Sequence, residues 1–235
     1  MTVRGILFGA YFYALTTVAV IVYLPFLLTT ERIVRHLANF WCAAALAGLR
    51  VIGGVRWRYE GEKNLPDEPF ILACKHQSTW ETLSLSIYLR SPAFILKQEL
   101  TKIPLFGWYL HKVGSISVDR TAGASALRKM IEDTRRVLGT GRKIVIFPEG
   151  TRTQPGAKTR YHAGVIALYR DSGYPLVPAA LNSGLFWPRS IWHVRPGEIV
   201  LRFLPPLPSD MGRRELMATL EDVIEKTTRD LMEGR

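Results

Sequence analysis

A run of 23 uncharged residues near the N-terminus, from Ile6 to Leu28, most restricts what this chain can fold into. As a helix rising about 1.5 Å per residue, the run would be about 34 Å long, enough to cross a hydrocarbon core of about 30 Å. Pro25 shortens this helix, because an interior proline removes one backbone hydrogen bond and kinks the axis. Tyr11, Tyr13 and Tyr23 lie near the ends of the run, where interfacial aromatic residues are common. The run therefore predicts a membrane-associated helix.

The alternative for this run is a cleaved signal peptide, but its apolar region would be shorter, about 7–15 residues, and would end at small residues. Here Thr29-Thr30-Glu31-Arg32 follows, which favours a retained segment. A second apolar stretch, residues 33–53, has Arg35 near its start and either crosses the membrane or lies in its interface. In the interfacial case, the positive-inside tendency places residues 54–235 in the cytoplasm.

The net charge of +11 indicates an anionic partner, either nucleic acid, an acidic membrane surface or a phosphate-bearing substrate. No nucleic-acid-binding module is recognisable, so nucleic acid is not expected. Cys42 and Cys74 cannot form a disulfide framework and lack the spacing of a zinc site, which favours a reducing compartment. The histidines lie far apart, and there is no G-x-S-x-G nucleophile motif or phosphate-binding loop, so neither metal catalysis nor a serine nucleophile is indicated.

From Tyr59 onward, short apolar runs alternate with helical patterns. The runs of strand length are Phe70–Cys74, Phe94–Lys97, Ser115–Val118, Lys143–Phe147, Leu176–Ala180 and Glu198–Phe203. The last run is expected to pair with Trp192–Arg195 through the turn Pro196-Gly197. Helical faces cover residues 124–138 and 213–232. This alternation predicts an α/β fold, a mostly parallel sheet flanked by helices, with membrane-anchoring helices in residues 1–58 and the α/β domain in residues 59–235.

A histidine and an acid follow the first of these strands, in the segment Lys75-His76-Gln77-Ser78-Thr79-Trp80-Glu81. Active groups in open α/β sheets gather at the carboxyl ends of strands. With His76 in the turn and Glu81 in the first helical turn, the carboxylate can hold the imidazole as a general base for an alcohol. The alternative is a capping box, in which Glu81 only reaches back to the backbone of Ser78. The residues by themselves leave both interpretations open.

Two further charged segments end predicted strands. Residues 147–152 read Phe-Pro-Glu-Gly-Thr-Arg, in which Gly150 allows a tight turn and Arg152 offers a planar fork for a phosphate or carboxylate. Residues 114–120 end in Asp119 and Arg120. Each segment alone also fits a plain surface role, such as an ion pair worth less than about 1 kcal/mol. If the strands are parallel, all three segments lie at one edge of the sheet.

These segments, followed by Leu176-Val177-Pro178, stand in the order of the four motifs of the glycerolipid acyltransferases. Over about residues 60–205 the chain most resembles the bacterial 1-acyl-glycerol-3-phosphate acyltransferases (lysophosphatidic acid acyltransferases). The segment Lys97-Gln98-Glu99-Leu100, with Pro104 and Gly107 downstream, is also similar to that family. The phenylalanine-proline-glutamate block together with the histidine block makes the resemblance specific.

The resemblance implies that His76 deprotonates the free hydroxyl of a lysolipid acceptor and that Glu81 orients the imidazole. It implies that the acceptor's glycerol phosphate is bound by Lys97, Asp119, Arg120, Glu149, Gly150, Thr151 and Arg152. The reaction would convert 1-acyl-glycerol-3-phosphate into phosphatidic acid, with acyl-CoA or acyl carrier protein as acyl donor and no cofactor or metal. The enzyme would then lie on the lipid bilayer of a bacterial-type inner membrane, with its catalytic domain in the cytoplasm.

One departure from the family concerns the acid, which is usually Asp and is Glu81 here. Its extra methylene lengthens the side chain but keeps the charge, so we expect His76 still to be oriented. Three alternatives remain: the same chemistry on another lysolipid such as lyso-ornithine lipid, hydrolysis of the thioester by water, and a non-enzymatic basic protein of the membrane surface. The last alternative predicts that a His76→Ala variant keeps its function.

Overall fold

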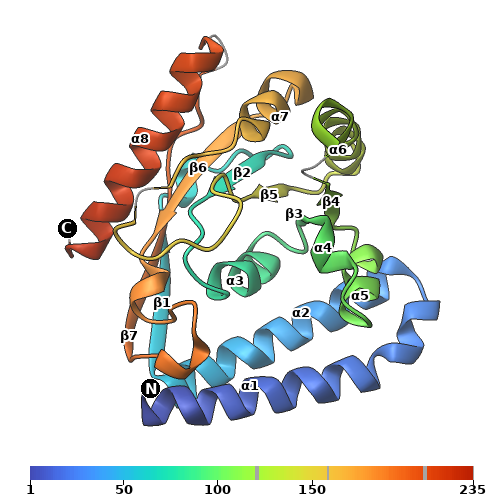
Figure 1. Ribbon diagram of the computed structural model, residues 1–235, viewed down its shortest axis with the longest axis vertical. Helices are drawn as coiled ribbons and strands as arrows, with labels where there is room; N and C mark the ends of the chain where they lie inside the picture. Colours follow the sequence, from blue (N-terminus) through green and yellow to red (C-terminus); the bar gives the residue numbers. More distant parts are fainter. Residues whose placement is uncertain (120–121, 158, 209–210, 235) are drawn as a thin grey trace.

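The computed structural model describes residues 1–119, 122–157, 159–208 and 211–234. Within these residues, seven strands form one sheet between layers of helices, in the order β1-β7-β6-β2-β5-β3-β4 (Figure 1). The strands are β1 (Val55–Glu60), β2 (Ile71–Cys74), β3 (Ala93–Lys97), β4 (Ile116–Val118), β5 (Ile144–Ile146), β6 (Leu176–Leu181) and β7 (Gly197–Phe203). Neighbouring strands are parallel except β6 and β7, so the prediction of a mostly parallel sheet is confirmed.

Helices cover both faces of this sheet. They are α1 (Val3–Val22), α2 (Glu31–Gly48), α3 (Trp80–Tyr88), α4 (Gln98–Thr101), α5 (Phe106–Lys112), α6 (Gly123–Leu138), α7 (Gly164–Ser172) and α8 (Arg213–Met232). Alternate residues of the buried strand β2 face opposite layers, as the period of a strand requires. Leu72 and Cys74 pack with α1, α2 and α3, whereas Ile71 and Ala73 pack with α6, α7 and α8.

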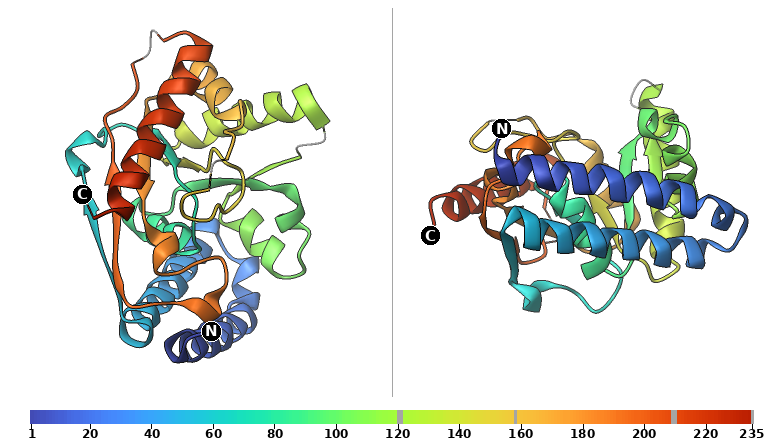
Figure 2. Two further views of the ribbon diagram at one scale, coloured as in Figure 1. Left: turned by 60° about the vertical axis from the view of Figure 1, so that its left-hand side comes forward. Right: turned by 90° about the horizontal axis from the view of Figure 1, so that it is seen from below.

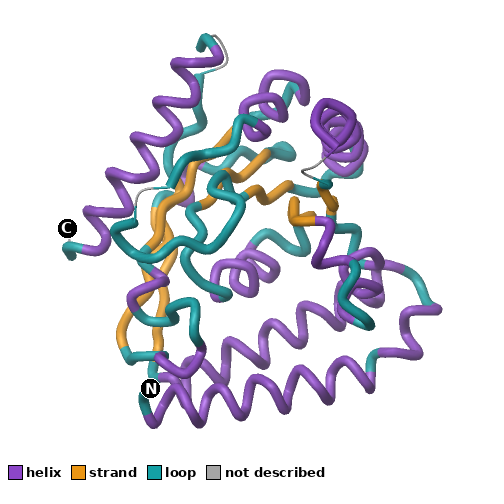
Figure 3. The backbone as a smooth tube through the Cα atoms, viewed as in Figure 1, coloured by secondary structure: helices purple, strands orange, loops and turns teal. Residues whose placement is uncertain are grey.

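Strand β2 lies between β5 and β6 in the middle of the sheet, and all of its residues are buried. The segment that follows Cys74 therefore starts at the centre of the carboxyl edge. It is a loop that leads into α3 (Figure 3). In an open parallel sheet this edge is where ligands bind, so the fold places the histidine segment in a favourable position.

The sheet begins earlier than the sequence analysis indicated, because β1 starts at Val55 and runs parallel to β7. The division after residue 58 therefore falls inside a strand. Trp57 and Tyr59 pack against the core, while Arg56 and Arg58 are exposed. This alternation is the signal that identifies the strand, although half of its side chains are charged.

The expected hairpin between Trp192–Arg195 and the last strand is wrong. Residues Ile191–His193 form a short 3₁₀ turn instead. One edge of β7 pairs in parallel with β1, which is distant in sequence, and the other edge pairs antiparallel with β6. No edge is left for the neighbouring segment, so tertiary pairing overrides the local turn signal.

The two N-terminal helices lie side by side and antiparallel (Figure 2). α1 ends at Val22, before Pro25, and the chain continues as a 3₁₀ turn over Leu24–Leu28. A hydrogen bond from the Tyr11 hydroxyl to the Ala44 carbonyl, 2.9 Å long, joins the pair. Among the described helices, α1 alone has the length and hydropathy to cross a membrane. It is thus the candidate for membrane association that the sequence predicts.

α1 also packs on the α/β domain rather than standing apart from it. Phe8 is fully buried, and its ring meets Trp187 edge-on with 5.0 Å between the ring centroids. The Thr2 amide donates a hydrogen bond of 3.0 Å to the Trp192 carbonyl. The opposite face is exposed at Val18 and Ile21. α1 therefore joins the protein core on one side and presents apolar side chains on the other.

Candidate active site

His76 lies directly after β2, and its imidazole is held by an acid. The Nδ1 atom is 2.9 Å from Oε1 of Glu81, which comes from the first turn of α3. Glu81 is fully buried, whereas the His76 side chain keeps 16% of its surface exposed. Because Nδ1 is engaged with the carboxylate, the second ring nitrogen, Nε2, is the one that can meet a substrate. The pair has the arrangement of a general base and its orienting acid.

Glu81 is held in turn by several donors. The amides of Gln77 and Ser78 each donate to Oε1 over 2.7 Å, and the Ser183 hydroxyl donates to Oε2 over 2.9 Å. The Ser78 hydroxyl accepts a hydrogen bond from the Trp80 amide. The contact expected of a capping box is therefore present together with the contact to His76. One carboxylate starts the helix and orients the imidazole, so the two interpretations are compatible.

The imidazole is also fixed by an aromatic ring from the neighbouring strand. Phe147, just after β5, stacks on His76 with 3.9 Å between the ring centroids and 14° between the planes. Phe94 of β3 stacks behind Phe147. Strand order makes this contact possible, since β5 lies beside β2. The carboxylate and this ring together restrict both the tilt and the rotation of the imidazole.

The turn after β5 brings the second motif to the same place. Gly150 has a φ of 66°, a left-handed conformation that favours glycine. Arg152 donates a hydrogen bond of 3.0 Å to the Thr79 hydroxyl, and the Thr153 amide donates one of 2.8 Å to the His76 carbonyl. The two loops are thus tied to each other, with the guanidinium of Arg152 beside the start of α3.

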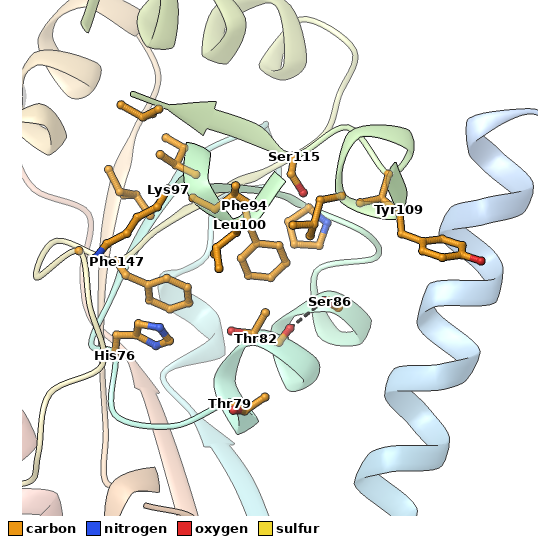
Figure 4. Close-up of a pocket in the computed structure, with 18 of the residues that line it drawn as sticks. His76, Thr79, Thr82, Ser86, Phe94, Lys97, Leu100, Tyr109, Ser115 and Phe147 are labelled. Atoms are coloured by element: carbon orange, nitrogen blue, oxygen red, sulfur yellow. Dashed lines mark hydrogen bonds between the residues drawn. The ribbon is translucent and has the colours of Figure 1, made fainter. Parts of the chain in front are cut away.

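A cavity of about 910 Å³ includes His76 in its lining and extends to the N-terminal helices. Near His76 its walls carry Lys97 at the end of β3, together with Thr79 and Arg152, and farther away they are largely apolar. Figure 4 shows His76, Phe147 and Lys97 toward one end and Tyr109 at the other. The distant walls come from α1, α2 and α5, through Ala19, Val20, Val34, Cys42, Phe106 and Leu110. A molecule with a polar head and a long apolar chain suits this shape.

The other residues expected at the site fall into three groups. Asp119, Gly150 and Thr151 line the cavity with Lys97 and Arg152. Glu149 does not appear in that lining: its buried side chain faces Lys75 and the His76 amide. Arg120 lies outside the described residues. Burial raises the pKa of Glu149, and the ammonium of Lys75 opposes this increase.

The sequence analysis did not single out Lys75, Phe147, Thr79 or Ser183 individually as contributors. Lys75, Thr79 and Phe147 lie inside the quoted motifs, where their side-chain types gave no separate signal. Ser183 follows β6, 102 residues from Glu81, and only the fold brings it to the carboxylate. Among the described residues, no group of three or more His, Cys, Asp or Glu side chains is arranged to hold a metal ion.

Known proteins resemble this chain in sequence and in fold. The family model described as "Acyltransferase" matches residues 56–182, which include β1 from its second residue, β2 through β6 and every motif of the site. The chain belongs to the acyltransferase family. It is therefore an enzyme of acyl transfer, which contradicts the alternative of a non-enzymatic membrane-surface protein.

Among curated proteins, this acyltransferase is 33% identical to the 1-acyl-sn-glycerol-3-phosphate acyltransferase of Pseudomonas aeruginosa, over 84% of this chain and 77% of the relative. It is 29% identical to the lyso-ornithine lipid O-acyltransferase of the same organism, over 63% of this chain and 54% of that one. The crystal structure of the 1-acyl-sn-glycerophosphate acyltransferase from Thermotoga maritima matches with a TM-score of 0.78 at 26% identity, covering 97% of this chain and 96% of the other. The resemblance found in the sequence is confirmed.

Proposed function

We propose that this acyltransferase moves a fatty acyl chain from an acyl thioester to the sn-2 hydroxyl of 1-acyl-glycerol-3-phosphate and so produces phosphatidic acid. The observation that carries the proposal is the contact of 2.9 Å between His76 Nδ1 and Glu81, at the polar end of a largely apolar cavity. Support for the acceptor comes from the relatives that carry this name, over most of their length. The thioester is acyl-CoA or acyl carrier protein, and both are substrates rather than cofactors.

In the proposed mechanism, Nε2 of His76 takes the proton of the acceptor hydroxyl while that oxygen attacks the thioester carbonyl. The new carbon–oxygen bond forms, the carbon–sulfur bond breaks, and the departing thiolate takes the proton back from the imidazolium. Glu81 holds the ring throughout, and no acyl-enzyme intermediate is needed. A positioned base of this kind contributes about 10²–10⁴ to the rate.

The acceptor phosphate, with a charge of about −1.5 to −2, needs cationic donors near the base. Lys97 and Arg152 line the cavity and are proposed as two of them. The family resemblance adds Arg120 as a third. Asp119, Gly150 and Thr151 complete this wall of the site, while Glu149 contributes from behind it.

The membrane is proposed as the source of the acceptor and the destination of the product. α1 leaves Leu7, Val18 and Ile21 exposed, each by more than half of its surface. Burial of such side chains in lipid favours association with a bilayer. The enzyme is accordingly proposed to lie on a bacterial-type inner membrane with the catalytic domain toward the cytoplasm, where acyl-CoA and acyl carrier protein are found.

The test is acyl transfer in detergent, from labelled acyl-CoA and from labelled acyl carrier protein, to lysophosphatidic acid and to lyso-ornithine lipid. The His76→Ala variant is compared with His36→Ala, which changes an exposed histidine of α2. Phosphatidic acid formed by the wild type and by His36→Ala but not by His76→Ala supports the proposal. Transfer only to lyso-ornithine lipid overturns the acceptor, and thioester hydrolysis without transfer overturns the reaction.

A further inference from the structure

Lys75 is an almost fully buried lysine that the proposed mechanism does not use. It stands between β2 and His76, with 2% of its side chain exposed. Its ammonium lies 3.1 Å from Oε1 of Glu149 and 2.5 Å from Oε1 of Glu225 on α8. An unpaired ammonium at such a site would be very unfavourable, and these two carboxylates compensate its charge.

A tyrosine completes the surroundings of this ammonium. The Tyr161 hydroxyl donates a hydrogen bond of 2.8 Å to the same Glu225 oxygen, and its ring centroid lies 6.0 Å from Nζ of Lys75. Tyr161 is itself buried. The network therefore joins the loop before α7, helix α8 and the turn after β5 at Lys75, the residue next to His76.

This network reaches the base through Glu149. Its Oε1 atom pairs with the Lys75 ammonium and also accepts a hydrogen bond of 3.2 Å from the backbone amide of His76. Its Oε2 atom is buried with no hydrogen-bond partner in the described part of the chain. One oxygen thus holds both groups, and the position of that oxygen depends on the ammonium beside it.

We propose that Lys75 is a positioning residue for acyl transfer: its ammonium holds the Glu149 carboxylate where it accepts the His76 amide, and this contact keeps the imidazole at Glu81. The role rests on the proposed function of His76 as general base. Without the ammonium, the buried Glu149 favours its neutral form and accepts the amide less strongly. The histidine loop then gains freedom, and even a small displacement of a catalytic group lowers the rate.

A purely structural ion pair is the competing explanation, because buried pairs are often replaceable by apolar residues without loss of stability. The two explanations differ in what they predict for turnover. A structural pair affects the unfolding temperature and leaves the kcat of the folded enzyme unchanged. A positioning residue lowers kcat and changes the KM for the acceptor little, since the groups that bind the phosphate stay in place.

The experiment compares acyl transfer by the full chain in detergent for the wild type, Lys75→Met and Glu221→Gln, with unfolding temperatures measured alongside. Glu221 lies one turn before Glu225 on α8 and serves as the matched control. We expect Lys75→Met to lower kcat by about tenfold or more, with the KM for lysophosphatidic acid within about twofold. Glu221→Gln keeps both values.

A second pair of variants has the same charge in both members, so any effect of charge on folding is common to them. Lys75→Met/Glu149→Gln and Lys75→Met/Glu149→Met both lack the buried ion pair, but only glutamine keeps an oxygen for the His76 amide. We expect the glutamine variant to turn over about tenfold faster than the methionine variant. This comparison tests the proposal even if Lys75→Met by itself does not fold.

Three results overturn the proposed role in different ways. If the wild type transfers acyl chains and Lys75→Met keeps its kcat, the role of Lys75 is overturned and the proposed function is not. Equal turnover of the two double variants has the same consequence. A wild type that transfers no acyl chain to any acceptor overturns the proposed function, and the role of Lys75 with it.

Discussion

The loop after β2 and the helix pair α1–α2 line opposite ends of the same cavity, and different forces hold them. In the loop, nearly every polar atom of the His76–Glu81 pair has a partner: Glu81 alone accepts from His76, Gln77, Ser78 and Ser183. The helix pair is joined mainly by apolar packing, with isolated hydrogen bonds such as that between Tyr11 and Ala44.

The difference fits the roles proposed for the two regions. A general base must keep its ring nitrogen within a few tenths of an ångström of a reactive position, and hydrogen bonds with defined angles achieve this. A surface that meets lipid needs apolar area, which is not directional. Substitutions in the loop should therefore change the rate, whereas substitutions in the helix pair should change stability or membrane affinity, depending on which face they lie on.

The substitution Glu81→Gln is expected to have the largest effect, and the quantity that it lowers is the turnover number. The amide keeps the shape of the side chain but removes the negative charge that favours the imidazolium of the proposed transition state, so we expect kcat to fall by about 10²–10⁴. Steady-state acyl transfer measures it, with Glu132→Gln, an exposed glutamate of α6, as the control. A loss below fivefold would show that His76 needs no charged partner.

The Glu81→Asp variant sharpens the same comparison. Aspartate is the acid that the family usually has, but in this backbone it lacks one methylene of the reach to Nδ1, while keeping the charge. We expect about a tenfold loss of kcat, between the wild type and Glu81→Gln. Turnover equal to that of the wild type would mean that α3 shifts to restore the contact.

The next effect concerns the stability of the helix pair. Phe8→Ala empties a fully buried site against Trp187, so we expect it to cost about 3–5 kcal/mol of unfolding free energy. Denaturant unfolding in detergent measures this loss. A cost below 1 kcal/mol would indicate that α1 is a separable anchor, contrary to its packing on the domain.

A smaller effect is expected at the polar end of the cavity. Arg152→Ala removes the charge-assisted contact that we propose with the acceptor phosphate, which predicts a KM for lysophosphatidic acid about ten- to hundredfold higher. The comparison acceptor is a lysolipid without a phosphate. If both acceptors lose affinity equally, Arg152 supports the loop through Thr79 rather than binding phosphate.

The smallest effect on the fold is expected on the exposed face of α1. Ile21→Ser changes a side chain that is 64% exposed, so the unfolding free energy should change by less than about 0.5 kcal/mol. Binding to vesicles of anionic phospholipid should nevertheless weaken several-fold, as measured by co-sedimentation. Unchanged vesicle binding would assign membrane contact to another surface.

Much of the local structure could be predicted from short stretches of sequence. The helix over 213–232 and the one starting near residue 124 follow from apolar spacing, and Gly139 lies directly after the second of them. The central strands follow from short apolar runs. β1 was missed because its charged residues conceal a strand that is half exposed, and the expected hairpin at Pro196 was wrong because β7 has no free edge.

The sequence by itself determined the chemistry that is available. A histidine and an acid five residues apart follow one strand, and a turn rich in polar groups follows another strand of the same sheet. These signals are local, since each depends on side chains within a few residues of one another. Only the tertiary structure decided that β5 lies beside β2, which brings Phe147 and Glu149 to His76 across more than 70 residues. It also placed Glu225 at Lys75 and Phe8 against Trp187. Such contacts depend on how the apolar faces of the whole chain pack together, and no short pattern specifies that.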